Sequence, residues 1–302
     1  MNRQPKRFAA LVFHWVATFL LLCFTSETVA MEQRVPRTFG MPSRYYQVGP
    51  NPNAIAVADL TDNGLPDIVT VDRGALHNPR EERPANDEIS LLLAELPLDY
   101  VRRHPSLKTG FAPYDVALAN VDGLKWPDII TVNFHTARHR DISVFLNFKD
   151  DGIFKPVVFE IPSNLLSYHR HYDAESMPMY TTPGLTAVAI RDLNQDGLRD
   201  LIATAWSSDV IVFMPGHEEK IFDTPRLMPA PGGPRAFALT DLDEDGLPDL
   251  AVAMYATAEI AVFKGDGTGN FVEYDRGAGS ADKRGDYDQW HKYWYTKTLK
   301  AD

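Results

Sequence analysis

The chain has 302 residues, with 41 Asp and Glu against 30 Lys and Arg and a formal net charge of −11. A hydrophobic content of 44% excludes a mostly disordered chain. The acidic balance argues against general binding to nucleic acids or anionic membranes, because both polyanions would repel the protein. The single cysteine excludes an intramolecular disulfide and a cysteine-based zinc site.

The first 30 residues have the layout of a secretory signal peptide. Three basic residues precede an apolar run over 8–24, and a polar stretch then ends in the small residue Ala30. We therefore expect a signal peptide over 1–30, a secreted, periplasmic or extracellular product, and no membrane span after cleavage. A short membrane anchor is the alternative, because the apolar run is at the lower limit for spanning. Cleavage would remove Cys23, leaving a mature chain without cysteine.

Four segments of the following region, 31–275, can be aligned with one another. In each, a short apolar strand leads into an acidic loop of nine residues, and a second short apolar strand leaves it. Internal repeats of this kind indicate a fold built from equivalent units. The loops begin at Asp59, Asn120, Asp192 and Asp241.

Each pair of strands is followed by two more apolar segments. The third strands are expected at Ile89–Leu93, Ile142–Leu146, Val210–Phe213 and Ile260–Phe263. The fourth strands are expected near Tyr100–His104, Phe154–Ile161, Lys220–Pro225 and Phe271–Tyr274. The strands are too short for βαβ units, and four strands per repeat predict an all-β fold, a β-propeller with four visible four-stranded blades.

The acidic loops predict calcium sites. Side-chain oxygens at positions 1, 3, 5 and 9, a glycine at position 6 and a backbone carbonyl at position 7 are hard oxygen ligands, which suit Ca²⁺. The fourth loop offers Asp241, Asp243, Asp245, Leu247 and Asp249. The third offers Asp192, Asn194, Asp196, Leu198 and Asp200, and the first offers Asp59, Thr61, Asn63, Leu65 and Asp67.

The second loop is a weaker candidate for metal binding. Asn120, Asp122 and Asp128 keep the frame, but position 6 is Lys125 and the glycine is at 123. We expect calcium affinity to fall from the fourth loop through the third to the first, with the second empty. The alternative is that the loops are Asp- and Asn-rich turns that need no metal.

The repeated pattern Asp-x-[Asp/Asn]-x-Asp-Gly-x-x-Asp between two strands resembles the FG-GAP and VCBS repeats of integrin α-subunit propellers and of many secreted bacterial proteins. The resemblance implies a calcium-stabilised propeller that serves in adhesion or recognition. Such propellers often have seven blades, whereas four repeats are visible in this chain. The chain could therefore form a small closed ring, an open ring completed by another chain, or a ring in which some blades are too degenerate to recognise.

Propeller geometry places the long insertions 72–88, 133–141 and 162–184 on the face opposite the calcium loops. Binding sites often lie on such loops. We expect a ligand site there that could bind metal, supply acid–base groups or recognise an acidic sugar; simple solvated loop residues are the alternative. The candidate residues are His135, Arg138, His139, His169 and His171. Trp206 and Tyr255 would border this face, more as packing residues than as ligands.

The segment 276–302 is expected to be a linker followed by an aromatic C-terminal tail, which packs on the propeller or docks a partner.

The leading functional hypothesis is a secreted recognition or adhesion module for an extracellular protein or carbohydrate. A polysaccharide lyase or hydrolase using the histidines is the second. A structural subunit of an extracellular assembly, with a second copy or another chain completing the ring, is the third.

Overall fold

The structure is a computed structural model that describes residues 44–74, 86–135, 140–148, 154–162 and 183–273. The chain divides into two compact units, Met1–Tyr46 and Gln47–Asp302, and all of the described strands belong to the second. The expected signal peptide and the expected linker and tail over 276–302 lie outside the described residues. Within the described residues, no helix has the length and apolar character needed to cross a membrane.

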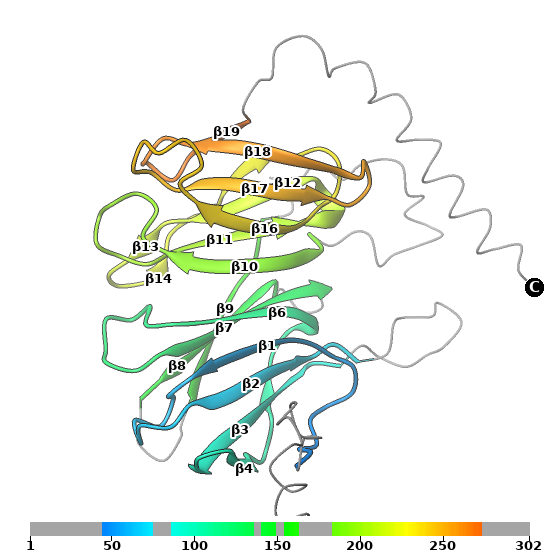
Figure 1. The fold of residues 1–302 in the computed structure, drawn as a ribbon, viewed down its shortest axis with the longest axis vertical. Coiled ribbons are helices and arrows are strands. Elements are labelled where there is room, and N and C mark those ends of the chain that lie inside the picture. Colours follow the sequence, from blue (N-terminus) through cyan, green and yellow to red (C-terminus); the bar gives the residue numbers. More distant parts are fainter. Residues whose placement is uncertain (1–43, 75–85, 136–139, 149–153, 163–182, 274–302) are drawn as a thin grey trace, which may run out of the picture. The chain divides into compact units, whose positions relative to one another are not determined.

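Each of the four repeats forms one antiparallel sheet, and the sheets follow one another in chain order (Figure 1). The first blade contains β1 (Pro52–Ala58), β2 (Asp67–Asp72), β3 (Glu88–Leu96) and β4 (Asp99–Arg102), with β5 (Leu107–Lys108) also beside β3. The second contains β6 (Phe111–Ala119), β7 (Asp128–His135), β8 (Ile142–Asn147) and β9 (Phe154–Phe159).

The third blade contains β10 (Leu185–Arg191), β11 (Asp200–Ala205), β12 (Val210–Met214) and β15 (Arg226–Pro229), with a 3-10 turn η4 (Trp206–Ser208) after β11. The fourth contains β16 (Pro234–Thr240), β17 (Asp249–Met254), β18 (Glu259–Gly265) and β19 (Phe271–Glu273). These sheets confirm the predicted all-β propeller architecture with four visible four-stranded blades.

The fourth strand of the third blade was predicted at the wrong place. The segment expected at Lys220–Pro225 instead belongs to a small hairpin of β13 (Gly216–His217) and β14 (Ile221–Phe222). The blade's outer strand is β15, which pairs Arg226 with Phe213 and Pro229 with Val210. Pairing with β12 begins only after Pro225, a residue that has no backbone N–H to donate.

The hydrophobic core lies between successive blades. The middle strands β8, β11 and β12 are buried along their whole lengths, because each of these blades is covered on both faces. This explains why apolar residues occupy successive positions in these strands instead of every second position. Three clusters of buried side chains join blades one and two, two and three, and three and four. Within the described residues, no cluster joins blade four to blade one.

The three interfaces between blades are built in the same way. The residue directly after the last aspartate of each loop faces the preceding blade, and the residue after that faces the following blade. The first kind is represented by Ile129, Leu201 and Leu250, and the second by Val69, Ile130 and Ile202. Among the described residues, the first blade therefore has a face of the first kind that no preceding blade covers, and the fourth has a face of the second kind that no following blade covers.

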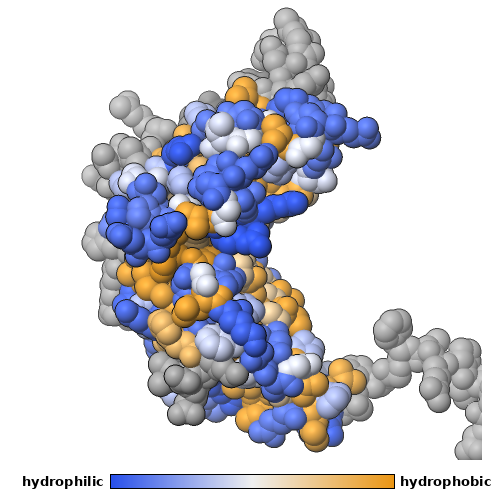
Figure 2. Space-filling model, turned by 90° about the vertical axis from the view of Figure 1, so that its left-hand side faces the viewer, coloured by the Kyte–Doolittle hydropathy of each residue, from blue (hydrophilic) through white to orange (hydrophobic). Residues whose placement is uncertain are grey.

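Both of these end faces expose apolar side chains. Ile55 and Val57 on β1 are 65% and 56% exposed, and Ile260 on β18 and Val272 on β19 are 59% and 65% exposed. Figure 2 shows hydrophobic side chains at the surface between charged and polar ones. The two faces are thus of the two kinds that meet at every interface inside the domain.

Candidate functional site

The aspartate at position 9 of each acidic loop is a buried structural residue. In the third loop, the two carboxylate oxygens of Asp200 accept hydrogen bonds from the backbone N–H of Leu193 at 2.8 Å and of Gly216 at 2.7 Å. The carboxylate therefore ties the loop to the end of the third strand. The same pair of bonds is made by Asp67, Asp128 and Asp249.

Burial changes the acidity of two of these carboxylates. It raises the pKa of Asp128 to about 6, although the bonds from the N–H groups of Val121 and Asn147 act in the opposite direction. Burial also raises the pKa of Asp200, again against the backbone bonds. Removal from water disfavours the charged form, and the N–H groups restore only part of that loss.

The first, third and fourth loops share one backbone conformation. Position 4 is left-handed at Asp62, Gln195 and Glu244, and position 6 is a glycine with positive φ. In the fourth loop, the φ of Gly246 is +88°, and its N–H donates to Asp241 at 2.8 Å. A side chain is strained in this conformation, so glycine is favoured there. The position-1 carboxylate is thereby directed into the loop.

The second loop has a different backbone. Gly123 occupies position 4 with φ +77°, and its N–H donates to Asn120 at 2.9 Å. Position 6 is Lys125, whose Nζ reaches Asp62 of the first loop at 2.8 Å. The glycine in this loop therefore serves the turn at position 4, and the lysine places a cation beside the neighbouring acidic loop.

Carboxylates converge most closely in the fourth loop. Oxygens of Asp241, Asp243 and Asp249 lie within 4.8 Å of one another, the one such group of three among the described residues. The Nζ of Lys264 also lies in this loop, bonded to Asp243 and at 2.9 Å from Asp245. This ammonium group lowers the pKa of Asp245. The donor set fits a hard cation, which would compete with Lys264 for two of the carboxylates.

The third loop fits a cation for another reason. Oδ1 of Asp192, at position 1, is buried and has no hydrogen-bond partner in the described part of the chain, while its Oδ2 accepts the N–H of Gly197 at 3.0 Å. A buried carboxylate oxygen without a partner is costly, and a bound cation would satisfy it. The geometry of the third and fourth loops is thus compatible with the predicted calcium ligands, which remain predictions.

Most of the candidate ligand residues on the long insertions lie outside the described residues. This applies to Arg138, His139, His169 and His171, and to the side chain of His135, whose backbone ends β7 opposite Phe111. The predicted ligand set therefore stays a prediction.

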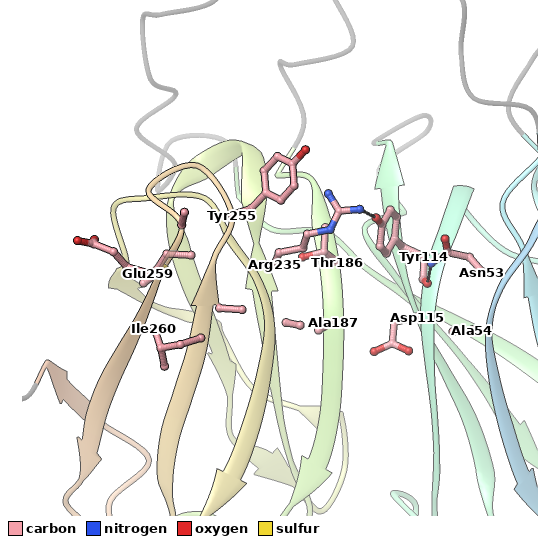
Figure 3. A pocket seen from close by; sticks show the side chains of 14 residues that line it. Asn53, Ala54, Tyr114, Asp115, Thr186, Ala187, Arg235, Tyr255, Glu259 and Ile260 are labelled. Atoms are coloured by element: carbon pink, nitrogen blue, oxygen red, sulfur yellow. Dashed lines mark hydrogen bonds between the residues drawn. The ribbon is translucent and has the colours of Figure 1, made fainter. Parts of the chain in front are cut away.

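A pocket of about 680 Å³ is lined by the first strands of the four blades, β1, β6, β10 and β16, and by residues of blade four between Ala253 and Ile260. Each of these strands has a register shift of one residue, a β-bulge, near its start. The four bulged residues all line the pocket (Figure 3): they are Asn53, Tyr114, Thr186 and Arg235. A bulge re-aims the side chain of the extra residue, so each blade contributes one such group to the pocket. We call this site the inner-strand pocket.

The bulged residues also connect different blades. Nδ2 of Asn53 donates to the carbonyl of Tyr114 at 2.6 Å, and the Thr186 hydroxyl donates to the carbonyl of Pro234 at 3.4 Å. Arg235 extends from blade four to blade two, where its guanidinium donates to the Tyr114 hydroxyl (Figure 3). The pocket wall is therefore held together by groups that line it.

A second set of equivalent residues stands beside the bulges, at the ends of the second strands. It consists of Arg73, Phe134, Trp206 and Tyr255. The three aromatic residues of this set form a chain of ring contacts with Tyr114. The centroid distances are 5.6 Å from Tyr114 to Phe134, 5.8 Å from Phe134 to Trp206 and 6.3 Å from Trp206 to Tyr255. Trp206 is thus a packing residue, as expected, whereas Tyr255 lines the pocket and is 61% exposed.

Two guanidinium groups lie over these rings. The Cζ atoms of Arg73 and Arg235 are 5.3 Å and 5.6 Å from the Tyr114 ring centroid, and that of Arg235 is 4.9 Å from the centroid of Tyr255. These distances are those of cation–π contacts. The pocket lining also includes two carboxyl groups, Asp115 and Glu259.

Asp115 is held by backbone N–H groups. Its two oxygens accept from Val116 at 2.9 Å and, across the blade boundary, from Val188 at 3.0 Å. Burial raises its pKa, and the two backbone bonds act against that change. Asp115 therefore joins the inner strands of blades two and three.

Apart from Tyr255, which was expected to border the ligand face, the pocket residues were missed in the sequence, although a signal for them exists. The bulged residues lie six positions before the first residue of each acidic loop, and the second set lies six positions after its last aspartate. The aligned repeats therefore mark both sets as equivalent positions. Because the chemistry differs from blade to blade, no motif is repeated there, and only the structure shows that the four blades contribute to one pocket.

An FG-GAP-like repeat family matches residues 192–252, which run from the third acidic loop into the second strand of the fourth blade. No curated protein matches the sequence. Among solved structures, the fold is similar to a candidate 6-phosphogluconolactonase from Bacteroides uniformis, with 17% identity, a TM-score of 0.51 and coverage of 76% of this chain and 58% of that one.

The periplasmic gluconolactonase PpgL from Pseudomonas aeruginosa is similar as well, with 15% identity, a TM-score of 0.51 and coverage of 74% of this chain and 56% of that one. The chain thus spans just over half the length of these structural neighbours. The repeat match and these likenesses together support a β-propeller fold with an FG-GAP-like repeat at residues 192–252.

Proposed function

We propose that this protein is an exported, calcium-stabilised β-propeller that recognises an extracellular carbohydrate in the inner-strand pocket. The observation that carries the proposal is the convergence of four bulged residues, one from each blade, on a single pocket next to an exposed aromatic ring. A pocket of about 680 Å³ falls within the usual range for small-ligand sites. Amide, hydroxyl, phenol and guanidinium groups supply the hydrogen bonds that sugar hydroxyls require.

Calcium enters this proposal as a stabiliser of the opposite ends of the blades. The chain's own residues hold the third and fourth loops in shape through the backbone bonds of Asp200 and Asp249. A bound cation would neutralise the remaining carboxylates. We expect the melting temperature to rise with added Ca²⁺ and to fall with chelator, since a ligand that binds only the folded state stabilises it. An unchanged melting temperature would contradict this part.

The recognition role is tested by screening the purified chain against an array of neutral and acidic oligosaccharides, at constant Ca²⁺. The Tyr255→Ala variant removes an exposed ring of the pocket. Phe148→Ala is the matched control, because Phe148 is a partly exposed aromatic residue in the turn after β8 and does not line the pocket. We expect binding by the wild type and the control, and loss of signal in Tyr255→Ala. Equal signals from all three proteins would refute the pocket as the site.

A sugar-lactone hydrolase is the second candidate. The specific observation is a carboxyl group of raised pKa, Asp115, in the lining of a pocket, and both structural neighbours carry gluconolactonase names. Because both oxygens of Asp115 already accept backbone N–H groups, we rank recognition first. Release of acid from glucono-δ-lactone by the wild type but not by Asp115→Asn would reverse this ranking.

A further inference from the structure

Two arginines of the inner-strand pocket region lack a carboxylate partner within the described residues. Arg235 makes one side-chain hydrogen bond, to the neutral phenol of Tyr114, and two ring contacts. Arg73 makes one ring contact through its side chain, also with Tyr114. A guanidinium has five N–H donors, so most of the donors of both groups are not used by the described part of the chain.

The chain as a whole is acidic, with a net charge of −11. Lys108 pairs with Asp87 and Glu88, and Lys264 pairs with Asp243 and Asp245, whereas Arg73 and Arg235 make no such pair within the described residues. In the pocket lining, Asp115 is engaged by backbone N–H groups, and Glu259 is exposed at the start of β18. The guanidiniums of Arg73 and Arg235 lie against the Tyr114 ring, and that of Arg235 also lies against the Tyr255 ring; these contacts do not neutralise the positive charges.

The rings and the guanidiniums together favour one class of ligand. A planar, oriented guanidinium binds a carboxylate through two parallel hydrogen bonds. An exposed aromatic ring such as Tyr255 offers an apolar surface with a polar edge, suited to the C–H face of a sugar ring. Acidic peptides usually add to a sheet edge or lie in a groove, whereas this pocket lies along the innermost strands.

Resting on the proposed function, we infer that the inner-strand pocket selects carbohydrates that carry a carboxylate, of the uronic-acid class. Arg235 receives the carboxylate, Tyr255 stacks on the sugar ring, and Arg73, which contacts the Tyr114 ring, adds positive charge near the pocket. Asn53, whose Nδ2 donates to the Tyr114 carbonyl, presents its amide to the hydroxyl groups of the sugar.

The test uses titration calorimetry with the full chain at fixed Ca²⁺ and two probes, trigalacturonate and the neutral galactotriose of the same linkage. We expect the wild type to bind the acidic probe about tenfold more tightly or better, the difference a charge-assisted bidentate contact provides. In Arg235→Gln this preference should fall to near unity. Arg235→Lys should keep part of the preference for the acidic probe, because the positive charge remains while the paired N–H donors of the guanidinium are lost.

Arg226→Gln is the control for charge, since Arg226 lies on the outer strand β15 and contacts Phe213 rather than the pocket. It should keep the full preference, and circular dichroism should show that every variant is folded. Equal wild-type affinity for both probes, or a preference that survives in Arg235→Gln, overturns the selection for carboxylates and leaves the proposed function standing. Failure to bind either probe overturns the selection for uronic acids, and the oligosaccharide array then decides the proposed function separately.

Discussion

The buried aspartates that end the acidic loops show how one residue type serves two purposes. Asp200 lies at a predicted calcium position, yet its oxygens already accept the N–H groups of Leu193 and Gly216. Asp196, four residues earlier, is exposed. Substitutions of these two residues can therefore distinguish the structural role of the loop's carboxylates from their role in metal binding.

Asp200→Ala should lower the free energy of unfolding by about 2–4 kcal/mol even in chelator, because two backbone N–H groups at this buried end of the loop lose their acceptor. Asp196→Ala, the control, should have an effect below about 1 kcal/mol in chelator and a larger one with Ca²⁺. Urea unfolding with and without EDTA measures both. Equal losses in EDTA would mean that the position-9 aspartate has no special structural role.

Asp115 provides a prediction about pH. Burial raises its pKa in the folded state above the ordinary value of 3.8. Between 3.8 and that raised value the folded state therefore binds more protons than the unfolded state, so its contribution to stability decreases as the pH increases. Relative to Asp115→Asn, the wild type should lose stability as the pH rises above 3.8.

Urea unfolding between pH 4 and pH 7 measures this difference. Glu259→Gln is the control, because Glu259 is an exposed carboxyl group of the same pocket, and its stability curve should run parallel to that of the wild type. A parallel curve for Asp115→Asn would show that Asp115 does not titrate differently on folding.

At the scale of the element, a lysine side chain from a neighbouring strand binds the carboxylates of the fourth loop. Lys264 on β18 pairs with Asp243 and Asp245 of the loop between β16 and β17. Lys264→Met removes a competitor for these carboxylates, so the affinity of the loop for Ca²⁺ should increase several-fold.

Calcium titration followed by calorimetry measures the change. Lys220→Met is the control for overall charge, since Lys220 is exposed in the hairpin of β13 and β14, and it should leave the affinity nearly unchanged. An affinity unaffected by Lys264→Met would indicate that Ca²⁺ does not use Asp243 or Asp245.

At the scale of the whole molecule, the two exposed end faces are of complementary kinds. Ile55 and Val57 lie on one, and Ile260 and Val272 on the other. Because faces of these two kinds pack together at each interface within the domain, a second copy is the expected partner, joined head to tail. Two copies would contribute eight visible blades, within the usual range for propellers.

We therefore expect light scattering to give a mass greater than that of one chain, and Ile260→Asp to reduce it. Leu98→Asp is the control, because Leu98 is equally apolar and 80% exposed but lies in the turn between β3 and β4. A monomer that is insensitive to Ile260→Asp would show that the end faces are not joined to a second copy.

The elements could be predicted from sequence wherever the pattern was local. Each acidic loop fixes a turn between two apolar strands, so β1, β2 and their counterparts were found from the loops alone. The outer strand of the third blade was misplaced because the apolar pair Ile221 and Phe222 lies where a fourth strand was expected, although it belongs to the hairpin Gly216–Phe222. The degenerate second loop was recognised, but its contact from Lys125 to Asp62 depends on the neighbouring blade.

The sequence by itself determined the repeat, the all-β architecture and the acidic ligand frame, because these depend on residues within about twenty positions of one another. Only the tertiary structure decided that Asn53, Tyr114, Thr186 and Arg235 line one pocket. The packing of successive blades brings these residues together across 182 positions of chain, from 53 to 235. A bulge re-aims the side chain of its extra residue, and because the four bulged residues differ in type, the aligned positions in the sequence do not show that they share one pocket.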